Sequence, residues 1–344
     1  MKKAVILGHF AFGRQCLNGQ TVKTKILPAE LERRFGADRI GKTDTGGGVR
    51  TLLKAPFQVL SALKNGENVI MLPAHNGLRV YGPLLSAAKR LFPGRRVHYV
   101  VIGGWLPGFL DSRPALRRSL GRFDGIYAET GTMVRALRER GLRNVFRMPN
   151  CKALTALAAP ELPKGEPYPL CTFSRVMPEK GIEQAVRAVE AVNRKQGRTV
   201  FSLEIFGQVE PGQEPWFARL QETFPPEVRY GGQVPFDEST GVLKGQYALL
   251  FPTRFYTEGV PGTLIDAYAA GVPVICARWE SFADVVEEGR VGLGYDFDDP
   301  GGLERILNQC AENPEILIKM RNDCLKKSRE FLPEQAVHVL AQRL

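Results

Sequence analysis

Two acids in the second half of the chain have the types and spacing needed to hold a long anionic ligand. Glu258 and Asp266 stand eight residues apart, on either side of Gly262 and Thr263, where we expect a helix to open. A helix N-terminus carries partial positive charge and backbone N–H groups that no helical carbonyl accepts, so it binds phosphates readily. At about 1.5 Å of rise per residue the two carboxylates would lie roughly 12 Å apart. That separation exceeds the about 5 Å between the carboxyls of a retaining glycosidase, and it suits acids that hold different parts of one phosphate-centred ligand.

A pair of cations lies upstream, after an apolar run at 169–174 that we expect to be a strand. Arg175 and Lys180 follow this run, and a helical pattern begins after Lys180. A diphosphate needs charge-assisted donors, and arginine offers a planar fork while lysine offers a point charge. These residue types therefore suit a diphosphate site.

The helix between the two acids should begin at Pro261, with Val260 as its N-cap, because proline loses no hydrogen bond at the first helical position. Gly262 has no side chain, so a ligand could approach the backbone closely. Gly271 should end this helix, and a buried strand should follow it.

Apolar runs recur along the chain at the spacing of alternating strands and helices. They lie at 3–7, 68–72, 96–102, 125–128 and 144–148, and then at 169–174, 200–206, 228–230, 247–251, 273–276 and 291–295. Helical patterns between them, such as 49–64, 78–91 and 133–140, predict α/β parallel sheets with helices on both faces. A length of 344 residues suits two such domains, and the proline- and alanine-rich stretch 151–169 suits a linker. Because ligands of parallel sheets bind beyond the carboxyl ends of the strands, site residues should follow strands.

Residues 36–43 match the P-loop pattern letter for letter. A P-loop needs a strand before it and a helix directly after it. Here a helical pattern at 29–35 precedes the match and Asp44-Thr45-Gly46 follows it. We therefore predict that this stretch is not a P-loop.

Positive charge is concentrated in the first half. Residues 1–169 hold 28 Lys and Arg against 11 Asp and Glu, a net charge of +17, while residues 170–344 hold 19 against 25. This asymmetry indicates an anionic partner for the first half, either a membrane surface, lipid phosphate or nucleic acid. We favour lipid, because Trp and Phe lie near the basic residues and no nucleic-acid-binding motif accompanies them. No apolar run reaches the about 18 residues of a spanning helix, and six cysteines without a C-x-x-C pair suit reduced thiols in the cytosol.

Segment 258–275 resembles the Glu-x7-Glu signature of retaining glycosyltransferases of family 4, with Asp266 in place of the second Glu. Segment 175–181 is similar to the Arg-x4-Lys-Gly element of the same family. The resemblance implies a GT-B fold, in which two Rossmann-like domains face each other across a cleft, and a sugar-nucleotide donor. It implies an acceptor domain at 1–150, a donor-nucleotide domain at 170–330 and a helix at 331–344 that crosses back to the first domain.

The same resemblance assigns roles to residues of the second half. Glu258 would bind the donor sugar, Asp266 the ribose, and Arg175 with Lys180 the diphosphate. The full set of expected donor-binding residues comprises Gly13, Gly19, Arg175, Lys180, Gly207, Val234, Glu258, Val260, Gly262, Thr263 and Asp266.

In the first half, the resemblance implies that a histidine at a strand end contacts the donor sugar and joins Glu258, Arg175 and Lys180 as a catalytic residue. His75 is best placed because it follows a strand, and His9 and His98 are the alternatives. The acceptor or membrane side is expected at Trp105, Phe109, Arg113, Arg117 and Arg118.

We therefore expect a retaining glycosyltransferase that needs no metal or cofactor and takes its sugar from a nucleoside-diphosphate sugar, with UDP the first choice. Segments 18–21 and 104–107 look like those of bacterial surface-polysaccharide transferases. This likeness implies a glycan or lipid-linked glycan acceptor and work in the cytoplasm or on the cytoplasmic face of the inner membrane. Two alternatives stay open: a GT-B sugar-nucleotide epimerase, and a non-enzymatic protein that binds nucleic acid or another polyanion.

Overall fold

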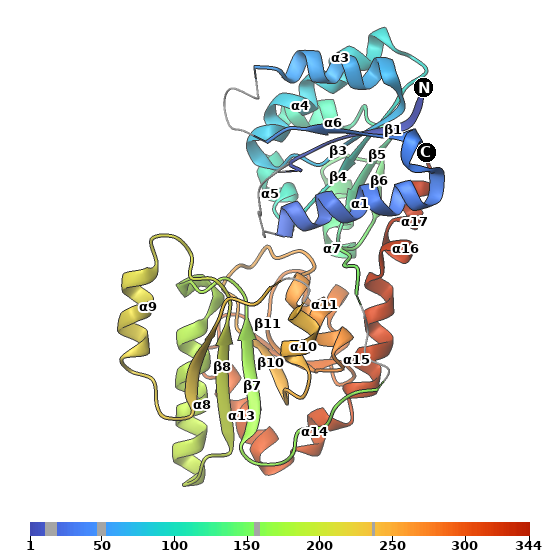
Figure 1. Ribbon diagram of the computed structural model, residues 1–344. Coiled ribbons are helices and arrows are strands. Elements are labelled where there is room, and N and C mark those ends of the chain that lie inside the picture. Colours follow the sequence, from blue (N-terminus) through green and yellow to red (C-terminus); the bar gives the residue numbers. More distant parts are fainter. Residues whose placement is uncertain (11–18, 47–52, 155–158, 236–237) are drawn as a thin grey trace. The chain divides into compact units, whose positions relative to one another are not determined.

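The chain forms two compact units (Figure 1). Unit 1 comprises Met1–Ala153 and Phe331–Leu344, and unit 2 comprises Leu154–Glu330. The structure is a computed structural model that describes residues 1–10, 19–46, 53–154, 159–235 and 238–344. Within these residues each unit contains one six-stranded sheet whose neighbouring strands all pair in parallel. The expected pair of Rossmann-like α/β domains is therefore confirmed.

The sheet of unit 1 has the strand order β2-β1-β3-β4-β5-β6. Its strands are β1 (Lys2–Gly8), β2 (Ile40–Asp44), β3 (Gly66–Met71), β4 (Arg96–Val100), β5 (Gly125–Ala128) and β6 (Val145–Arg147). Strand β2 was not predicted, and it occupies the second part of the P-loop-like stretch. Lys42 and Thr43 of that stretch pair with β1, so the geometry of a P-loop is absent there, as the sequence predicted.

Alternate residues of β1 face opposite sides of the sheet, which is the period of an extended strand. Val5 and Leu7 belong to a core that includes apolar residues of α3 (Ala55–Asn65), α4 (His75–Ala88), α5 (Leu106–Asp111), α6 (Pro114–Leu120) and α7 (Gly131–Glu139). Ala4 and Ile6 belong to a second core with α1 (Gly19–Phe35), α16 (Pro333–Ala336) and α17 (His338–Ala341). Both faces of the sheet are thus covered, and residues from the end of the chain complete one of them.

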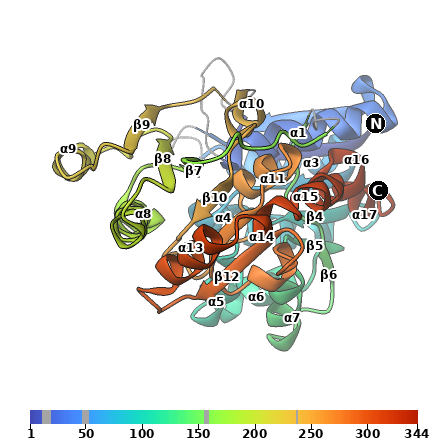
Figure 2. The same cartoon turned by 90° about the horizontal axis from the view of Figure 1, so that it is seen from below.

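The sheet of unit 2 has the strand order β12-β11-β10-β7-β8-β9. Its strands are β7 (Tyr168–Phe173), β8 (Phe201–Phe206), β9 (Val228–Gly232), β10 (Ala248–Phe251), β11 (Val274–Arg278) and β12 (Gly292–Asp296). On one face α8 (Ile182–Gln196) and α13 (Gly302–Glu312) lie side by side, and α9 (Glu214–Gln221) joins their core (Figures 1 and 2). A second group of packed helices comprises α10 (Ser239–Leu243), α11 (Gly262–Ala269) and α15 (Arg321–Ser328).

The predicted last helix differs from the structure. The helix expected over 331–344 is divided into α16 and α17. Helix α12 (Phe282–Val285) is only one turn long, because the chain is already extended at Val286. Within the described residues, no helix combines the length and apolar character needed to cross a bilayer.

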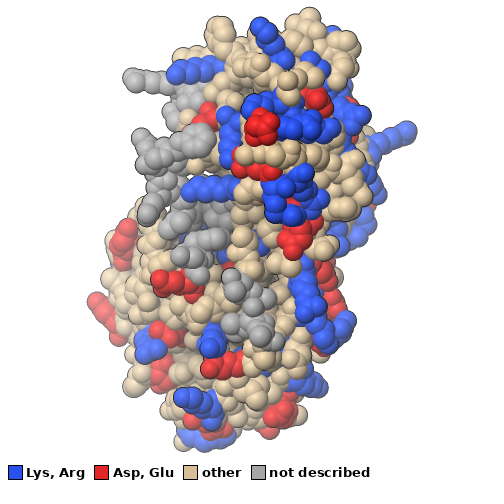
Figure 3. All heavy atoms as spheres, turned by 45° about the vertical axis from the view of Figure 1, so that its right-hand side comes forward, with Lys and Arg blue, Asp and Glu red and all other residues tan. Residues whose placement is uncertain are grey.

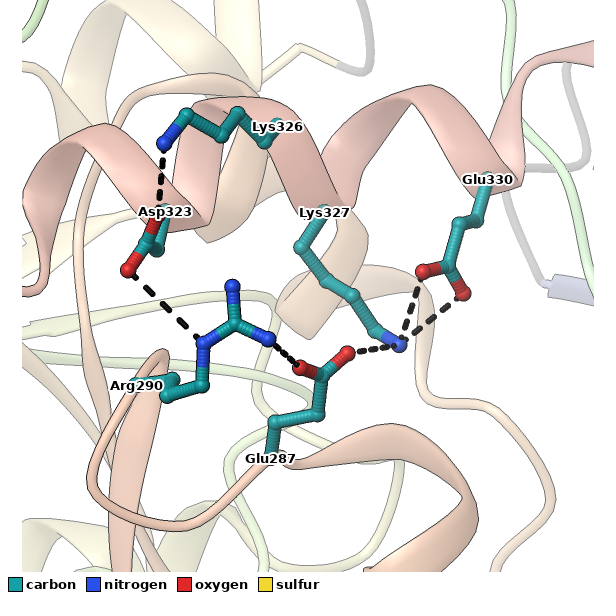
Figure 4. Close-up of polar contacts among 6 residues, drawn as sticks. All are labelled: Glu287, Arg290, Asp323, Lys326, Lys327 and Glu330. Carbon is teal, nitrogen blue, oxygen red and sulfur yellow. Dashed lines mark hydrogen bonds and ion pairs between the residues drawn. The ribbon is translucent and has the colours of Figure 1, made fainter.

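A network of ion pairs ties α15, which packs against α11, to the turn before β12 (Figure 4). Lys327 Nζ is almost buried and lies 2.9 Å from Glu287 Oε1 and 2.9 Å from Glu330 Oε2. The Lys327 ammonium holds the pKa of the Glu287 carboxyl below its usual value, although burial opposes the shift. The whole network comprises Glu287, Arg290, Asp323, Lys326, Lys327 and Glu330. The network therefore holds α15 in place, and α11, whose first turn is the candidate ligand-binding end, packs against α15.

Candidate functional site

The strand order of unit 2 identifies the position where a ligand site is expected. From β7 the chain proceeds outward through β8 and β9, and it then returns to place β10, β11 and β12 on the other side of β7. The order therefore reverses between β7 and β10. In open parallel sheets this reversal separates two neighbouring loops at the carboxyl ends of the strands and creates a ligand-binding crevice. The loop after β7 carries Arg175 and Lys180, and the loop after β10 carries Glu258.

Lys180 and Glu258 meet at this position. Lys180 Nζ forms a short ion pair with Glu258 Oε1, and the two side chains are 12% and 20% exposed. The same carboxylate oxygen accepts a hydrogen bond of 3.3 Å from the Thr253 hydroxyl. The ammonium also lies 4.8 Å from the centre of the Phe255 ring, a cation–π distance. Residues 78 positions apart thus form one half-buried charged centre.

The two loops are joined through their backbones as well. Arg254 N donates to Glu179 O at 2.8 Å. Gly181 has a φ of +69°, and a Cβ there would lie 2.0 Å from Pro252 O. Only glycine allows this approach, so Gly181 fixes the place of Lys180 beside the β10 loop.

Arg175 has a different partner from Lys180. Its guanidinium is 55% exposed and lies 2.9 Å from Glu210 Oε2, on the loop after β8. Gly207 at the end of β8 brings these loops together: it has a φ of +135°, and a Cβ there would lie 1.7 Å from Ser174 O. Gly207 N donates to Gly232 O at 2.8 Å. Candidate Val234 follows Gly232 on the loop after β9 and is half-buried.

The helix end at the β10 loop lies one residue further along than predicted. Pro261 is the N-cap of α11 and Gly262 is its first residue, because Pro261 has an extended ψ of 129° rather than a helical one. Val260 is buried just before it. Thr263, in the first turn, has a buried hydroxyl oxygen that no hydrogen-bond partner reaches within the described part of the chain. Asp266 lies one turn later and is only 2% exposed.

In unit 1, His75 and three of the residues expected on the acceptor side form a stack at the carboxyl ends of β3 and β4. The His75 ring lies 3.9 Å from Trp105 and 5.2 Å from Phe109, and the Arg113 guanidinium lies 3.9 Å over Phe109. The pKa of His75 is below its ordinary value because its neighbours remove water from the ring and, secondly, because Arg113 is positive.

Other sequence candidates of unit 1 are placed as follows. Gly19 is the first residue of α1, and Gly13 lies outside the described residues. Arg117 and Arg118 lie in the last turn of α6. His98 is buried in β4 between Asn68 and Tyr127, at 3.2 Å from each, so it is engaged inside the unit.

Sequence reasoning did not identify Thr253, Phe255 and Glu210. Thr253 and Phe255 follow the predicted strand at 247–251, so their position beyond a carboxyl end was an available signal. Glu210 follows β8 in the same way, but only the structure pairs it with Arg175. Across the described ranges, no group of three or more His, Cys, Asp or Glu has the arrangement of a metal site.

Comparisons with known proteins concern the second half of the chain and the fold as a whole. Residues 168–313, which include β7 to α13, match the family described as Glycosyl transferases group 1. A D-inositol 3-phosphate glycosyltransferase of Corynebacterium efficiens is 27% identical over 161 residues. The match covers 46% of this chain and 38% of that relative, so the chain spans well under half of the relative's length.

Two solved structures share the fold along the whole chain. The lipopolysaccharide outer core galactosyltransferase WaaB, in its apo form, has a TM-score of 0.73 at 15% identity and covers 100% of both chains. HepE of Anabaena in complex with UDP-glucose has a TM-score of 0.71 at 15% identity, over 100% of this chain and 99% of that one. The expected GT-B fold, and the resemblance of the second half to glycosyltransferases, are confirmed.

Proposed function

We propose that this chain, which has a GT-B fold and a match to group 1 glycosyl transferases at 168–313, is a retaining glycosyltransferase of family 4 that uses a UDP-sugar. The observation that carries the proposal is the contact between Lys180 and Glu258 where the strand order of unit 2 reverses. A cation for a diphosphate and an acid for a sugar stand there side by side. HepE, which shares the fold, binds UDP-glucose.

In this proposal the diphosphate binds to Lys180, Arg175 and the first turn of α11 at Gly262 and Thr263. The buried Thr263 hydroxyl supports this assignment, since a phosphate oxygen would give it the partner it lacks among the described residues. Arg175 and Lys180 would exchange their carboxylate partners, Glu210 and Glu258, for phosphate oxygens. Glu258 would then be released to bind hydroxyls of the donor sugar.

The remaining proposed donor contacts are those that the family resemblance implies. Asp266 would bind the ribose from α11. Gly207 and Val234, after β8 and β9, would contact the base through backbone groups, and Val260 would line the site before α11.

The reaction would transfer the sugar with retention of configuration. The bond between the anomeric carbon and the diphosphate oxygen breaks, and the acceptor hydroxyl oxygen attacks on the same face. Negative charge develops on the leaving diphosphate, so Lys180, Arg175 and the α11 end stabilise the transition state more than the ground state. The acceptor proton passes to the departing phosphate. These groups supply the leaving-group stabilisation that a metal ion supplies in other transferases, so we propose a metal-independent reaction with no cofactor.

The acceptor is proposed to bind unit 1 at Trp105 and Phe109, which form an aromatic stack with His75 beside Arg113. His75 keeps its proposed contact with the donor sugar and its proposed part in catalysis. Stacked rings suit the faces of sugars, and a glycan or lipid-linked glycan of a bacterial surface polysaccharide is the proposed acceptor. WaaB, a lipopolysaccharide galactosyltransferase of the same fold, supports this class. The positive charge of the first half suits the cytoplasmic face of the inner membrane.

A thermal-shift screen of the whole chain against UDP, GDP, ADP and their sugars tests the donor. At a hundredfold excess over Kd, a ligand of the native state raises the midpoint by about 5 to 10 °C in a domain of this size. We expect UDP and UDP-sugars to give this shift. Lys180→Met should abolish it, and Lys195→Met, which changes an exposed lysine at the end of α8, should not.

The same protein distinguishes the alternatives. Conversion of a UDP-sugar to its isomer without acceptor would identify an epimerase. Salt-sensitive binding of RNA or DNA with no response to any nucleotide would identify a polyanion-binding protein. Either result would replace the proposed reaction.

A further inference from the structure

Helix α3 of unit 1 is apolar on two opposite sides. One side is buried against the sheet and α4, through Ala55, Val59, Ala62 and Leu63. On the opposite side the helix carries Phe57 and Leu60, which are 77% and 43% exposed. Their spacing of three residues places them on one face. Leu53, which is 75% exposed, lies in the turn two residues before the helix. A surface helix normally turns polar residues outward, so this face is a candidate docking surface. We call these three residues the α3 patch.

The outer position of α3 in unit 1 is visible in Figure 1, where it lies beyond α4 and the sheet. Beside its end runs the turn that leads into β4. Arg95 Nε of this turn donates to Leu63 O, in the last turn of α3, at 3.0 Å. Leu91, in the 3-10 helix η2 (Lys89–Leu91) that precedes this turn, is a further exposed leucine, at 74%. Four of the seven large apolar side chains that are exposed in the described residues therefore belong to α3, the turn before it and η2.

The charges around the α3 patch are positive. Lys54 and Lys64 are exposed on either side of it, and residues 53–65 contain no Asp or Glu. Arg90 is exposed next to Leu91. In the space-filling view, Lys and Arg outnumber Asp and Glu on the displayed side of unit 1 (Figure 3). This surface therefore complements a negatively charged partner.

We propose that the α3 patch docks the protein on an anionic lipid bilayer. Phe and Leu side chains at one helix face insert at the boundary between headgroups and acyl chains, and flanking lysines extend to the lipid phosphates. A protein partner would need acidic side chains around an apolar pocket, whereas a bilayer supplies both features along the whole patch. The inference extends the proposed membrane partner to a particular surface and does not depend on the donor chemistry.

This surface differs from the one expected from sequence. Trp105 and Phe109 pack against the core of unit 1 and against His75, so they are half-buried. They remain proposed acceptor contacts. Phe57, in contrast, offers most of its ring to solvent.

The experiment is co-sedimentation of the whole protein with phosphatidylcholine vesicles, without and with about 30 mol% phosphatidylglycerol, as an anionic surface of the kind found on cytoplasmic leaflets. Wild-type protein should bind the anionic vesicles. Phe57→Ser should weaken binding about tenfold or more, since it removes a large apolar side chain from the interface. Exchange of Lys54 and Lys64 for Glu should weaken it at least as much, and added salt should do the same. Leu162→Ser, at a 58% exposed leucine of unit 2, is the matched control and should bind like the wild type.

Several outcomes would overturn the proposal. One is equal binding to both vesicle types, and another is equal binding by the Phe57→Ser and wild-type proteins. A third is light scattering that finds a wild-type dimer and a Phe57→Ser monomer, which would identify a second copy as the occupant. Because Phe57 is exposed, its replacement should leave the melting temperature unchanged. UDP-induced shifts should also be unchanged, so failure of docking and failure of the donor site are separate results.

Discussion

Replacement of Glu258 by glutamine should tighten the binding of bare UDP while it slows sugar transfer. In the structure Lys180 Nζ is paired with Glu258 Oε1. A phosphate oxygen on the same ammonium would lie about 5 Å from the carboxylate, where two negative charges repel by about 1 to 3 kcal/mol at an effective dielectric constant between 80 and 20. Glutamine removes that charge and keeps an oxygen for the Thr253 hydroxyl. We therefore expect the Kd for UDP to fall about tenfold.

Transfer should change in the opposite direction. A charged hydrogen bond to a sugar hydroxyl contributes about 1.5 to 3 kcal/mol, so its loss should lower kcat by about ten- to a hundredfold. Titration calorimetry with UDP and a coupled assay of UDP release measure the two effects. Glu190→Gln is the control for net charge, because Glu190 is an exposed acid on α8, 4.0 Å from Arg194. A weaker UDP complex in Glu258→Gln, with the same loss as in turnover, would refute the role we assign to this acid.

Two further predictions concern residues that shape the units. Burial lowers the pKa of the His98 ring to about 4 in the folded protein, so the unfolded chain binds more protons than the folded protein in acid. The free energy of unfolding should therefore keep its full value above pH 6.5, the ordinary pKa of histidine. It should fall by about 3 kcal/mol as the pH drops to about 4. Urea unfolding at a series of pH values measures the free energy of unfolding of the wild type and of His98→Gln. This free energy should depend less on pH in the variant, and an equal dependence in both proteins would contradict the prediction. Gly181→Ala should abolish UDP binding and lower the melting temperature by several degrees, since its Cβ would lie 2.0 Å from Pro252 O. Gly197 has a similar φ of +67° but open space around it, so Gly197→Ala should lower the free energy of unfolding only by the about 1 to 2 kcal/mol of the left-handed conformation. Equal losses of stability in the two variants would show that the close approach at Gly181 is unimportant.

The sequence predicted those parts of the fold that depend on apolar periodicity. The run at 125–128 is the strand β5 with the same bounds, since a strand buried on both faces is a continuous apolar run. Strand β2 was missed because an edge strand needs little apolar character, and Ile40 is its only buried residue. The prediction of Val260 as N-cap was wrong by one residue, because a proline fits both the cap and the first helical position.

For the candidate site, the sequence placed Lys180 and Glu258 after strands, but strand order decides which loops become neighbours. Periodicity contains no information on that order, so the ion pair and its Thr253 contact required the structure. The partner of Arg175 is a similar case. Glu210 has no distinguishing sequence feature, and the close approach at Gly207 brings its loop to the arginine.

The composition of unit 1 has a consequence for how the chain folds during synthesis. Residues 331–344 supply Ala336, Val337 and Leu340 to a core whose other members precede residue 154. On the ribosome these residues emerge after the whole of unit 2, whose own chain is continuous. Unit 2 can therefore close its core while the nascent first unit still has an open apolar face. Because exposed apolar surface is prone to aggregation, we expect a chaperone to bind this face during synthesis.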